Sequence, residues 1–275
     1  MVNLSGQANY GNWVPANMMR ALWGTTATLG VATAVAAARK RPFATLGLAA
    51  LTLPCLAMST YMQLCRKAFA FGSSYDVMAK VHQNLVDHLP WDQTRQAAGV
   101  TDGSGTILDI GCGAGALTNR CALTFPNAKL IGIDYWGAEW SYAQEQCEQN
   151  ARIEGVSDRV SFEKGDAAQL AFADECFDAA VSNFVFHEVR SVKDKRDVVR
   201  EALRVVRRGG AFAFQDMFGQ EALYGNMKVF ISDLLSDGTV REIHYVENIE
   251  DTGLVPAFAK APWMIKDAGL IWGIR

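Results

Sequence analysis

The sequence predicts an α/β domain, built on a mostly parallel sheet with helices on both faces, that follows a separate apolar helical segment. From about Ser73 onward, short runs of strand length alternate with amphipathic helical stretches, a pattern typical of a parallel sheet. Residues 1–72 contain six basic residues and no Asp, Glu or His, whereas the remainder contains 20 basic and 29 acidic residues. We therefore expect two domains, residues 1–72 and residues 73–275.

Two uncharged runs in the first segment have the length of membrane helices. Ala21–Ala38 has 18 residues and Pro42–Cys65 has 24, separated by three basic residues. As helices they would reach about 27 and 36 Å, compared with a hydrocarbon core of about 30 Å. The second run could span a bilayer, and the first is a second span, a re-entrant piece or an interfacial helix. The alternative is a buried helical hairpin that covers the domain or an oligomer interface.

Charge and cysteine usage limit the partners and the compartment. A basic segment without acids suits an anionic membrane surface, whereas the acidic remainder argues against a nucleic-acid partner. The six cysteines show no CxxC or ligand spacing, and the four histidines are not spaced as a ligand set. We expect reduced core thiols and no metal site. The expected location is a membrane, with the second domain facing the cytosol.

The elements of the second domain follow in order from a first helix at Tyr75–Leu89. Strands are predicted at Thr106–Ile110, Lys129–Asp134, Val160–Lys164, Phe177–Asn183 and Ala211–Asp216. Helices are predicted between them at Ala116–Thr124, Glu139–Ile153 and Val192–Val206, the last closed by Arg207-Arg-Gly-Gly210. The remainder predicts a helix, a strand, a helix and a strand at Ala222–Leu235, Arg241–Glu250, Pro256–Lys266 and Gly269–Ile274. Ligands of such sheets bind beyond the carboxyl ends of the strands.

The loop after the first strand is rich in glycine. It reads Leu108-Asp-Ile-Gly-Cys-Gly-Ala-Gly-Ala-Leu-Thr118. Gly111, Gly113 and Gly115 would allow a sharp turn and close approach of a ligand, or merely tight packing of a helix against the strand. Dinucleotide-binding folds also have a glycine-rich turn here, but with Gly-x-Gly-x-x-Gly spacing and no need of an acid such as Asp109.

Polar side chains end or follow the next three strands. Asp134 ends the second strand, where its carboxylate can accept both hydroxyls of a ribose; alternatively it is the N-cap of the next helix. Asp166 follows the third strand, where it can accept a hydrogen bond from an exocyclic amine or only close a turn. Asn183 ends the fourth strand and either lines a ligand pocket or simply ends the strand.

With these residues the sequence resembles the class I S-adenosylmethionine-dependent methyltransferases, in the small-molecule group that includes quinone and sterol methyltransferases. The resemblance covers about Tyr75–Arg275 and includes residues 177–188 and 201–210. It implies a Rossmann-like sheet of seven strands in the order 3-2-1-4-5-7-6, with the last strand antiparallel. It also implies S-adenosylmethionine as the cofactor.

The resemblance further implies roles for single residues at the methionine end of the cofactor. Gly111, Gly113 and Gly115 would lie under the methionine part, and Asp109 would help to hold its amino group. For Asn183 two alternatives stay open: it lines the cofactor pocket or simply ends its strand.

At the adenosine end, the resemblance assigns the ribose to Asp134. Asp166 and the backbone of Ala167 would face adenine, with Tyr135 or Trp136 as an apolar wall. Trp136 could equally be a packing residue.

Methyl transfer from a sulfonium needs mainly alignment of the acceptor and exclusion of water. A base is needed only where the acceptor must lose a proton, and His187, in the loop after the fourth strand, is the candidate. Alternatively, His187 only hydrogen-bonds the backbone and shapes its loop. Weaker candidates are Asp216, Tyr224, His244 and Tyr75.

The expected function is methyl transfer to an apolar or amphipathic small molecule, such as a lipid, quinone or isoprenoid, at a membrane. One alternative is a methyltransferase for a soluble metabolite, with the N-terminus as tether or oligomer interface. Another is an inactive partner subunit that binds S-adenosylmethionine. A nicotinamide oxidoreductase is disfavoured by Asp109 and by the glycine spacing. Residues 251–268 would form a lid, a membrane-facing surface or a cover for the sheet edge.

Overall fold

The computed structural model describes residues 6–137, 144–260 and 265–275, and these form two compact units. The α/β unit comprises the residues up to Tyr10, Lys80–Val255 and the residues after Ala259. The helical unit comprises Gly11–Ala79 and Pro256–Ala259. Both units are discontinuous in the chain: a short stretch before Gly11 belongs to the α/β unit, and residues 73–79 belong to the helical unit.

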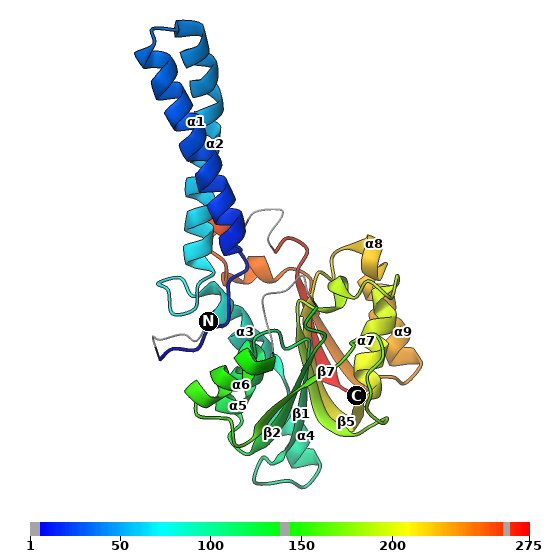
Figure 1. The fold of residues 1–275 in the computed structure, drawn as a ribbon. Coiled ribbons are helices and arrows are strands. Elements are labelled where there is room, and N and C mark those ends of the chain that lie inside the picture. Colours follow the sequence, from blue (N-terminus) through cyan, green and yellow to red (C-terminus); the bar gives the residue numbers. More distant parts are fainter. Residues whose placement is uncertain (1–5, 138–143, 261–264) are drawn as a thin grey trace. The chain divides into compact units, whose positions relative to one another are not determined.

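The helical unit is an antiparallel pair of long helices, α1 (Ala16–Ala38) and α2 (Pro42–Ala68), joined by a short turn (Figure 1). Two polar pairs join the helices. The hydroxyl oxygens of Thr26 and Ser59 lie 2.9 Å apart, and those of Thr33 and Thr52 lie 3.0 Å apart. Each helix contributes its two residues at a spacing of seven, which places both pairs on one helix face.

Seven strands form one sheet in the α/β unit, in the order β3-β2-β1-β4-β5-β7-β6. The strands are β1 Gly105–Ile110, β2 Ala128–Asp134, β3 Val160–Lys164, β4 Phe177–Asn183, β5 Val206–Asp216, β6 Glu242–Val246 and β7 Gly269–Ile274. The first five are parallel, and β7 is antiparallel to both β5 and β6. The predicted fold class and strand order are therefore confirmed.

Helices cover both faces of this sheet; Figure 1 shows α5 and α6 on one side and α7 and α9 on the other. The helices that follow α2 are α3 Val77–His88, α4 Trp91–Ala97, α5 Ala116–Thr124, α6 Gln144–Ile153, α7 Lys195–Arg204, α8 Glu221–Tyr224 and α9 Met227–Ser236. Short 3₁₀ turns lie at η1 Phe186–Glu188, η2 Ile249–Thr252 and η3 Ala257–Ala259. On the α7 and α9 side, Phe212 and Phe214 of β5 are fully buried in the core with Val199 and Phe230.

The predicted helix Val192–Val206 extends too far, because α7 ends at Arg204 and β5 begins at Val206. The two glycines were interpreted as the end of a helix, but both lie in strand β5. A Cβ atom on Gly210 would lie 2.7 Å from the carbonyl oxygen of Asp178, and the Gly209 N–H donates to the carbonyl of Arg275. Only glycine allows β5 to pass so close to β4.

The C-terminal third also departs from the prediction. The predicted helix Ala222–Leu235 is divided into α8 and α9 at Gly225, which has a φ of +61°, and Asn226 caps α9. The predicted strand Arg241–Glu250 ends at Val246. The described part of the predicted helix Pro256–Lys266 contains only η3, and residues 261–264 lie outside the described residues. The start of the predicted helix Glu139–Ile153 also lies outside them, and α4 was not predicted.

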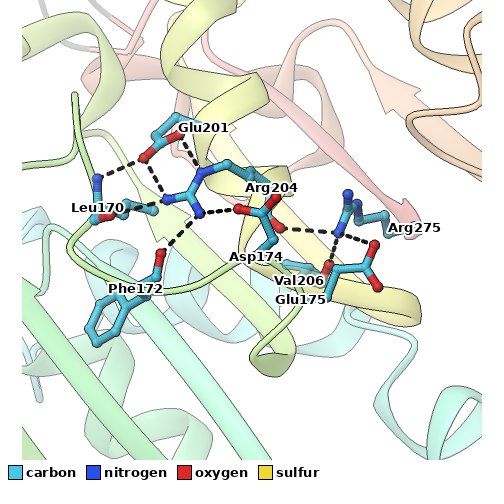
Figure 2. A network of polar contacts seen from close by, with 8 residues as sticks. All are labelled: Leu170, Phe172, Asp174, Glu175, Glu201, Arg204, Val206 and Arg275. Atoms are coloured by element: carbon cyan, nitrogen blue, oxygen red, sulfur yellow. Dashed lines mark hydrogen bonds and ion pairs between the residues drawn. The ribbon is translucent and has the colours of Figure 1, made fainter.

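A polar network lies where α7 ends and β5 begins (Figure 2). The Arg204 guanidinium bonds to Glu201 at 2.8 Å and to Asp174 at 2.6 Å. It also donates to the carbonyl oxygens of the loop before β4, those of Leu170 and Phe172. Arg275 donates to the carbonyls of Arg204 and Val206 and lies 3.4 Å from Glu175. Charged hydrogen bonds therefore join α7, β5 and the C-terminus.

Candidate functional site

The carboxyl ends of β1, β2 and β4 bring three of the predicted site residues to one face of the sheet. Asp109 pairs with Gly132 of β2 and with Val181 of β4. Side chains alternate between the faces along each strand. Asp109, Asp134 and Asn183 therefore share one face, whereas Asp216 at the end of β5 lies on the other.

Asp109 is deeply buried, with 1% of its surface exposed. Thr118 at the start of α5 donates a 2.5 Å hydrogen bond to its Oδ2, and no described group bonds to its buried Oδ1. Burial, opposed by the Thr118 bond and assisted by the charge of Asp134, raises the pKa of Asp109 to about 7. A buried carboxyl with an unmatched oxygen suits a ligand ammonium group.

The glycine-rich loop is shaped partly by the needs of the chain itself. Gly111 has a φ of +75°, and a Cβ atom there would lie 2.3 Å from a methyl group of Val185. Gly115, with a φ of +82°, is the left-handed residue that precedes α5. Packing and backbone conformation thus require these two glycines, whatever ligand the loop holds. Gly113, with a φ of +56°, donates its N–H to Asp134.

Asp134 connects the glycine-rich loop with the loop after β2. Its Oδ2 accepts the Gly113 N–H at 2.9 Å, and its Oδ1 accepts the Trp136 N–H at 2.8 Å. It caps the turn that follows β2 and not α6, which begins at Gln144. Each carboxylate oxygen can accept a second hydrogen bond, so Asp134 can still receive ribose hydroxyls. The Trp136 indole donates to the Gly113 carbonyl at 2.9 Å, which makes it a support of the loop.

The residues predicted to face adenine lie at the edge of the site. Tyr135 is 63% exposed, and the Lys164 ammonium lies 5.1 Å from the centre of its ring. Asp166 is exposed and accepts the Ala168 N–H at 2.8 Å, so it closes the turn after β3. Ala167, within that turn, is half-buried. The exposed Tyr135 ring offers the flat apolar surface that a base would need.

His187 and Asp216 form a pair where the loop after β4 meets the end of β5. His187 Nδ1 lies 2.7 Å from Asp216 Oδ1, and His187 Nε2 lies 3.4 Å from Glu188. Asp216 also accepts the backbone N–H groups of Val185 and Phe186. One carboxylate thus orients the imidazole and holds its loop. This arrangement fits a catalytic base and also a histidine that only shapes its loop.

The pKa of His187 reflects these neighbours. Burial alone would lower it, but the hydrogen bond and the charge of Asp216, with the charge of Glu188, outweigh burial and raise it above its ordinary value. The buried Tyr224 lies near Asp216, and burial followed by that charge raises its pKa strongly. A neutral phenol is therefore its stable form.

The other two weaker candidates have different surroundings. His244 on β6 bonds to Glu242 at 2.7 Å and stacks on Trp272. Tyr75 belongs to the helical unit, where its ring packs edge-on against Phe258.

A chain of polar contacts that joins β5, β4 and α3 was missed by the sequence analysis. Gln215 Nε2 donates to Asn183 Oδ1 at 2.6 Å, and Asn183 Nδ2 lies 3.2 Å from His82 Nε2 on α3. Asn183 and Gln215 are register partners on β4 and β5. The polar residue next to Asp216 in a buried strand was the available signal.

Comparison with known proteins identifies the unit that holds this site. Residues 108–214 match the family model described as a methyltransferase domain. The chain contains a class I S-adenosylmethionine-dependent methyltransferase domain. Its cofactor is therefore S-adenosylmethionine, and the unmatched oxygen of Asp109 suits the amino group of that cofactor. The position of each predicted residue relative to the cofactor remains a prediction.

Relatives of this methyltransferase domain occur among curated proteins. Methyltransferase GfsG of Streptomyces halstedii is 28% identical over 187 residues, 66% of this chain and 62% of that protein. The sterol 24-C-methyltransferase erg6 of Aspergillus fumigatus is 28% identical over 163 residues, 59% of this chain and 38% of that protein. The matches thus span less than two thirds of either relative.

A solved structure shares the fold of the domain. Geranyl diphosphate methyltransferase, determined in complex with S-adenosylmethionine, has a TM-score of 0.50 and 18% identity. The likeness covers 76% of this chain and 94% of that protein.

Proposed function

We propose that this methyltransferase transfers the methyl group of S-adenosylmethionine to an apolar or amphipathic small molecule, such as a lipid, quinone or isoprenoid, at a membrane. The exposed apolar surface of α1 and α2 carries the proposal, and the similarity to a sterol 24-C-methyltransferase supports the same class of acceptor. A bilayer concentrates apolar acceptors near a tethered domain.

The two helices of the hairpin have the length and composition to cross a membrane, and little of their apolar surface is buried. Phe43 is 90% exposed and Leu46 is 72% exposed. The other exposed large apolar side chains of the pair are Trp23, Val31, Val35, Leu51, Leu53, Leu56, Met58 and Leu64. Exposed apolar surface of this extent is typical of interaction with a membrane.

We further propose that the methyltransferase domain faces the cytosol. All six cysteines are free, which agrees with a reducing compartment. The expectation that all six are core thiols is wrong for Cys176, which is exposed, and for Cys55, which is half-buried.

In the proposed mechanism, the bound cofactor supplies an electrophilic methyl group on a sulfonium. Asp109 holds an ammonium group with its unmatched oxygen, and Asp134 accepts ribose hydroxyls. His187 removes a proton through Nε2 where the acceptor must lose one, because Asp216 holds Nδ1. Tight positioning, and not covalent chemistry by the protein, supplies the remaining rate enhancement.

Labelled methyl transfer tests the acceptor class. Full-length protein in detergent or vesicles is incubated with radiolabelled S-adenosylmethionine and either a membrane lipid extract or a water-soluble metabolite pool. We expect label in the lipid extract, and none with Asp134→Ala. Label only in the aqueous pool would exclude the lipid proposal, and cofactor binding without any label would indicate an inactive binding subunit.

A further inference from the structure

The first described residues of the chain, residues 6–10, lie against α6 in the α/β unit; we call them the N-terminal strap. The Asn9 backbone makes two hydrogen bonds with one side chain of α6. Its N–H donates to Asn150 Oδ1 at 2.8 Å, and Asn150 Nδ2 donates to its carbonyl at 2.8 Å. Asn150 therefore binds Asn9 in the way one strand of a sheet binds another.

Asn150 also reaches the glycine-rich loop. Its Nδ2 donates to the Ala114 carbonyl at 2.9 Å, and only 2% of Asn150 is exposed. The amide oxygen and both amide hydrogens of Asn150 are thus used. An amide turned the other way would face the Asn9 N–H with its own N–H groups, so the three contacts fix its orientation.

Further bonds join the strap to both helices that flank the loop. Gln146 of α6 donates to the Asn9 carbonyl at 2.6 Å. The Tyr10 hydroxyl donates to Glu154 at 3.0 Å and accepts a hydrogen bond from Asn119 of α5 at 3.1 Å. Asn119 is 1% exposed. The strap thus bridges α5, which the glycine-rich loop precedes, and α6.

We propose that the N-terminal strap is part of the cofactor site and that Asn150 is its positioning residue. This inference rests on the proposed function, because it takes the glycine-rich loop as the cofactor loop. Three glycines give this loop conformational freedom that is lost when a ligand binds. By fixing the Ala114 carbonyl beforehand, Asn150 reduces that loss, and the strap in turn holds Asn150.

Two substitutions at Asn9 separate the backbone bond from the side chain. Asn9→Pro removes the N–H that Asn150 accepts, whereas Asn9→Ala keeps both backbone groups. In full-length protein, calorimetry with S-adenosylmethionine should show a Kd for Asn9→Pro raised by about fivefold to tenfold, the size expected for one lost hydrogen bond. Asn9→Ala should raise the Kd clearly less than Asn9→Pro does, because Asn150 still bonds to both backbone groups of residue 9.

Asn150→Ala provides the second test, with the exposed Asn127→Ala as its control. We expect Asn150→Ala to raise the Kd by about tenfold and to raise the KM for S-adenosylmethionine while kcat at saturating cofactor is unchanged. If Asn150 had only a structural role, Asn150→Ala would lower the melting temperature without raising KM separately from kcat. An unchanged Kd in Asn9→Pro would overturn the inference. If the unchanged protein does not bind S-adenosylmethionine, the proposed function fails instead.

Discussion

The Asp109 carboxyl group combines deep burial with one unmatched oxygen. Burial, opposed by Thr118 and assisted by Asp134, raises its pKa to about 7. Because the pKa is raised by folding, this group favours the folded state at low pH, and its contribution is lost progressively as pH rises from about 4 to about 7. A bound ammonium group would restore the charged form.

Cofactor binding should therefore depend on pH. With a pKa near 7, about a tenth of Asp109 is ionised at pH 6 and about half at pH 7. We expect the affinity for S-adenosylmethionine to rise about fivefold over this range, with protons released on binding. Calorimetry in buffers of different ionisation enthalpy measures both the affinity and the number of protons released. Asp109→Asn should bind weakly at either pH; a retained pH dependence in this variant would assign the effect to another group.

His187 should set the pH dependence of turnover where the acceptor loses a proton. Its pKa is raised, so the paired, protonated form stabilises the fold below about pH 6.5, and this contribution is lost as pH rises through the raised value. The neutral form, which can act as a base, predominates only above that value. We expect kcat to rise with pH there, and His187→Ala to lower kcat by about 10²–10⁴-fold.

Asp216→Asn provides the companion variant, because it removes the charge that raises the pKa of His187. The rising limb of kcat should move to lower pH. Unchanged kcat in His187→Ala would leave this histidine as a support of its loop.

At the scale of elements, the helices α1 and α2 should hold the protein in a membrane through their apolar faces. Val31 and Leu53 are exposed near the middle of the two helices, at 65% and 64%. An Asp at the centre of a membrane helix costs about 2.5–3.5 kcal/mol. We expect the pair Val31→Asp and Leu53→Asp to move the protein into the supernatant on carbonate extraction of membranes.

Leu123→Asp is the matched control, since Leu123 is 52% exposed on α5 of the methyltransferase domain. It should leave the distribution unchanged. Extraction of the unaltered protein into the supernatant would contradict membrane association. The hydroxyl pairs between α1 and α2 would then be better explained as packing in a helical pair that is exposed to water.

At the scale of the whole molecule, the sequence was most informative where local pattern decides the structure. Strands β3, β4 and β7 were predicted with their observed ends, because β4 and β7 are mainly buried apolar runs and β3 begins with alternating apolar and polar residues. The Arg207-Arg-Gly-Gly210 run led to a wrong prediction of where the preceding helix ends. Glycines that allow close strand pairing look the same in sequence as glycines that end a helix. The contacts of Asn150 had no local signal, since Asn9 lies 141 positions away.

The methyltransferase domain is discontinuous in the chain. The chain leaves this domain after Tyr10 and enters it again at Lys80. A shortened protein that starts at residue 73 would delete the N-terminal strap together with the apolar helices. Weak cofactor binding by that fragment would then say nothing about the role of a bilayer. Excising the hairpin while splicing residues 1–10 to residue 80 would keep every partner of Asn150 and answer that question separately.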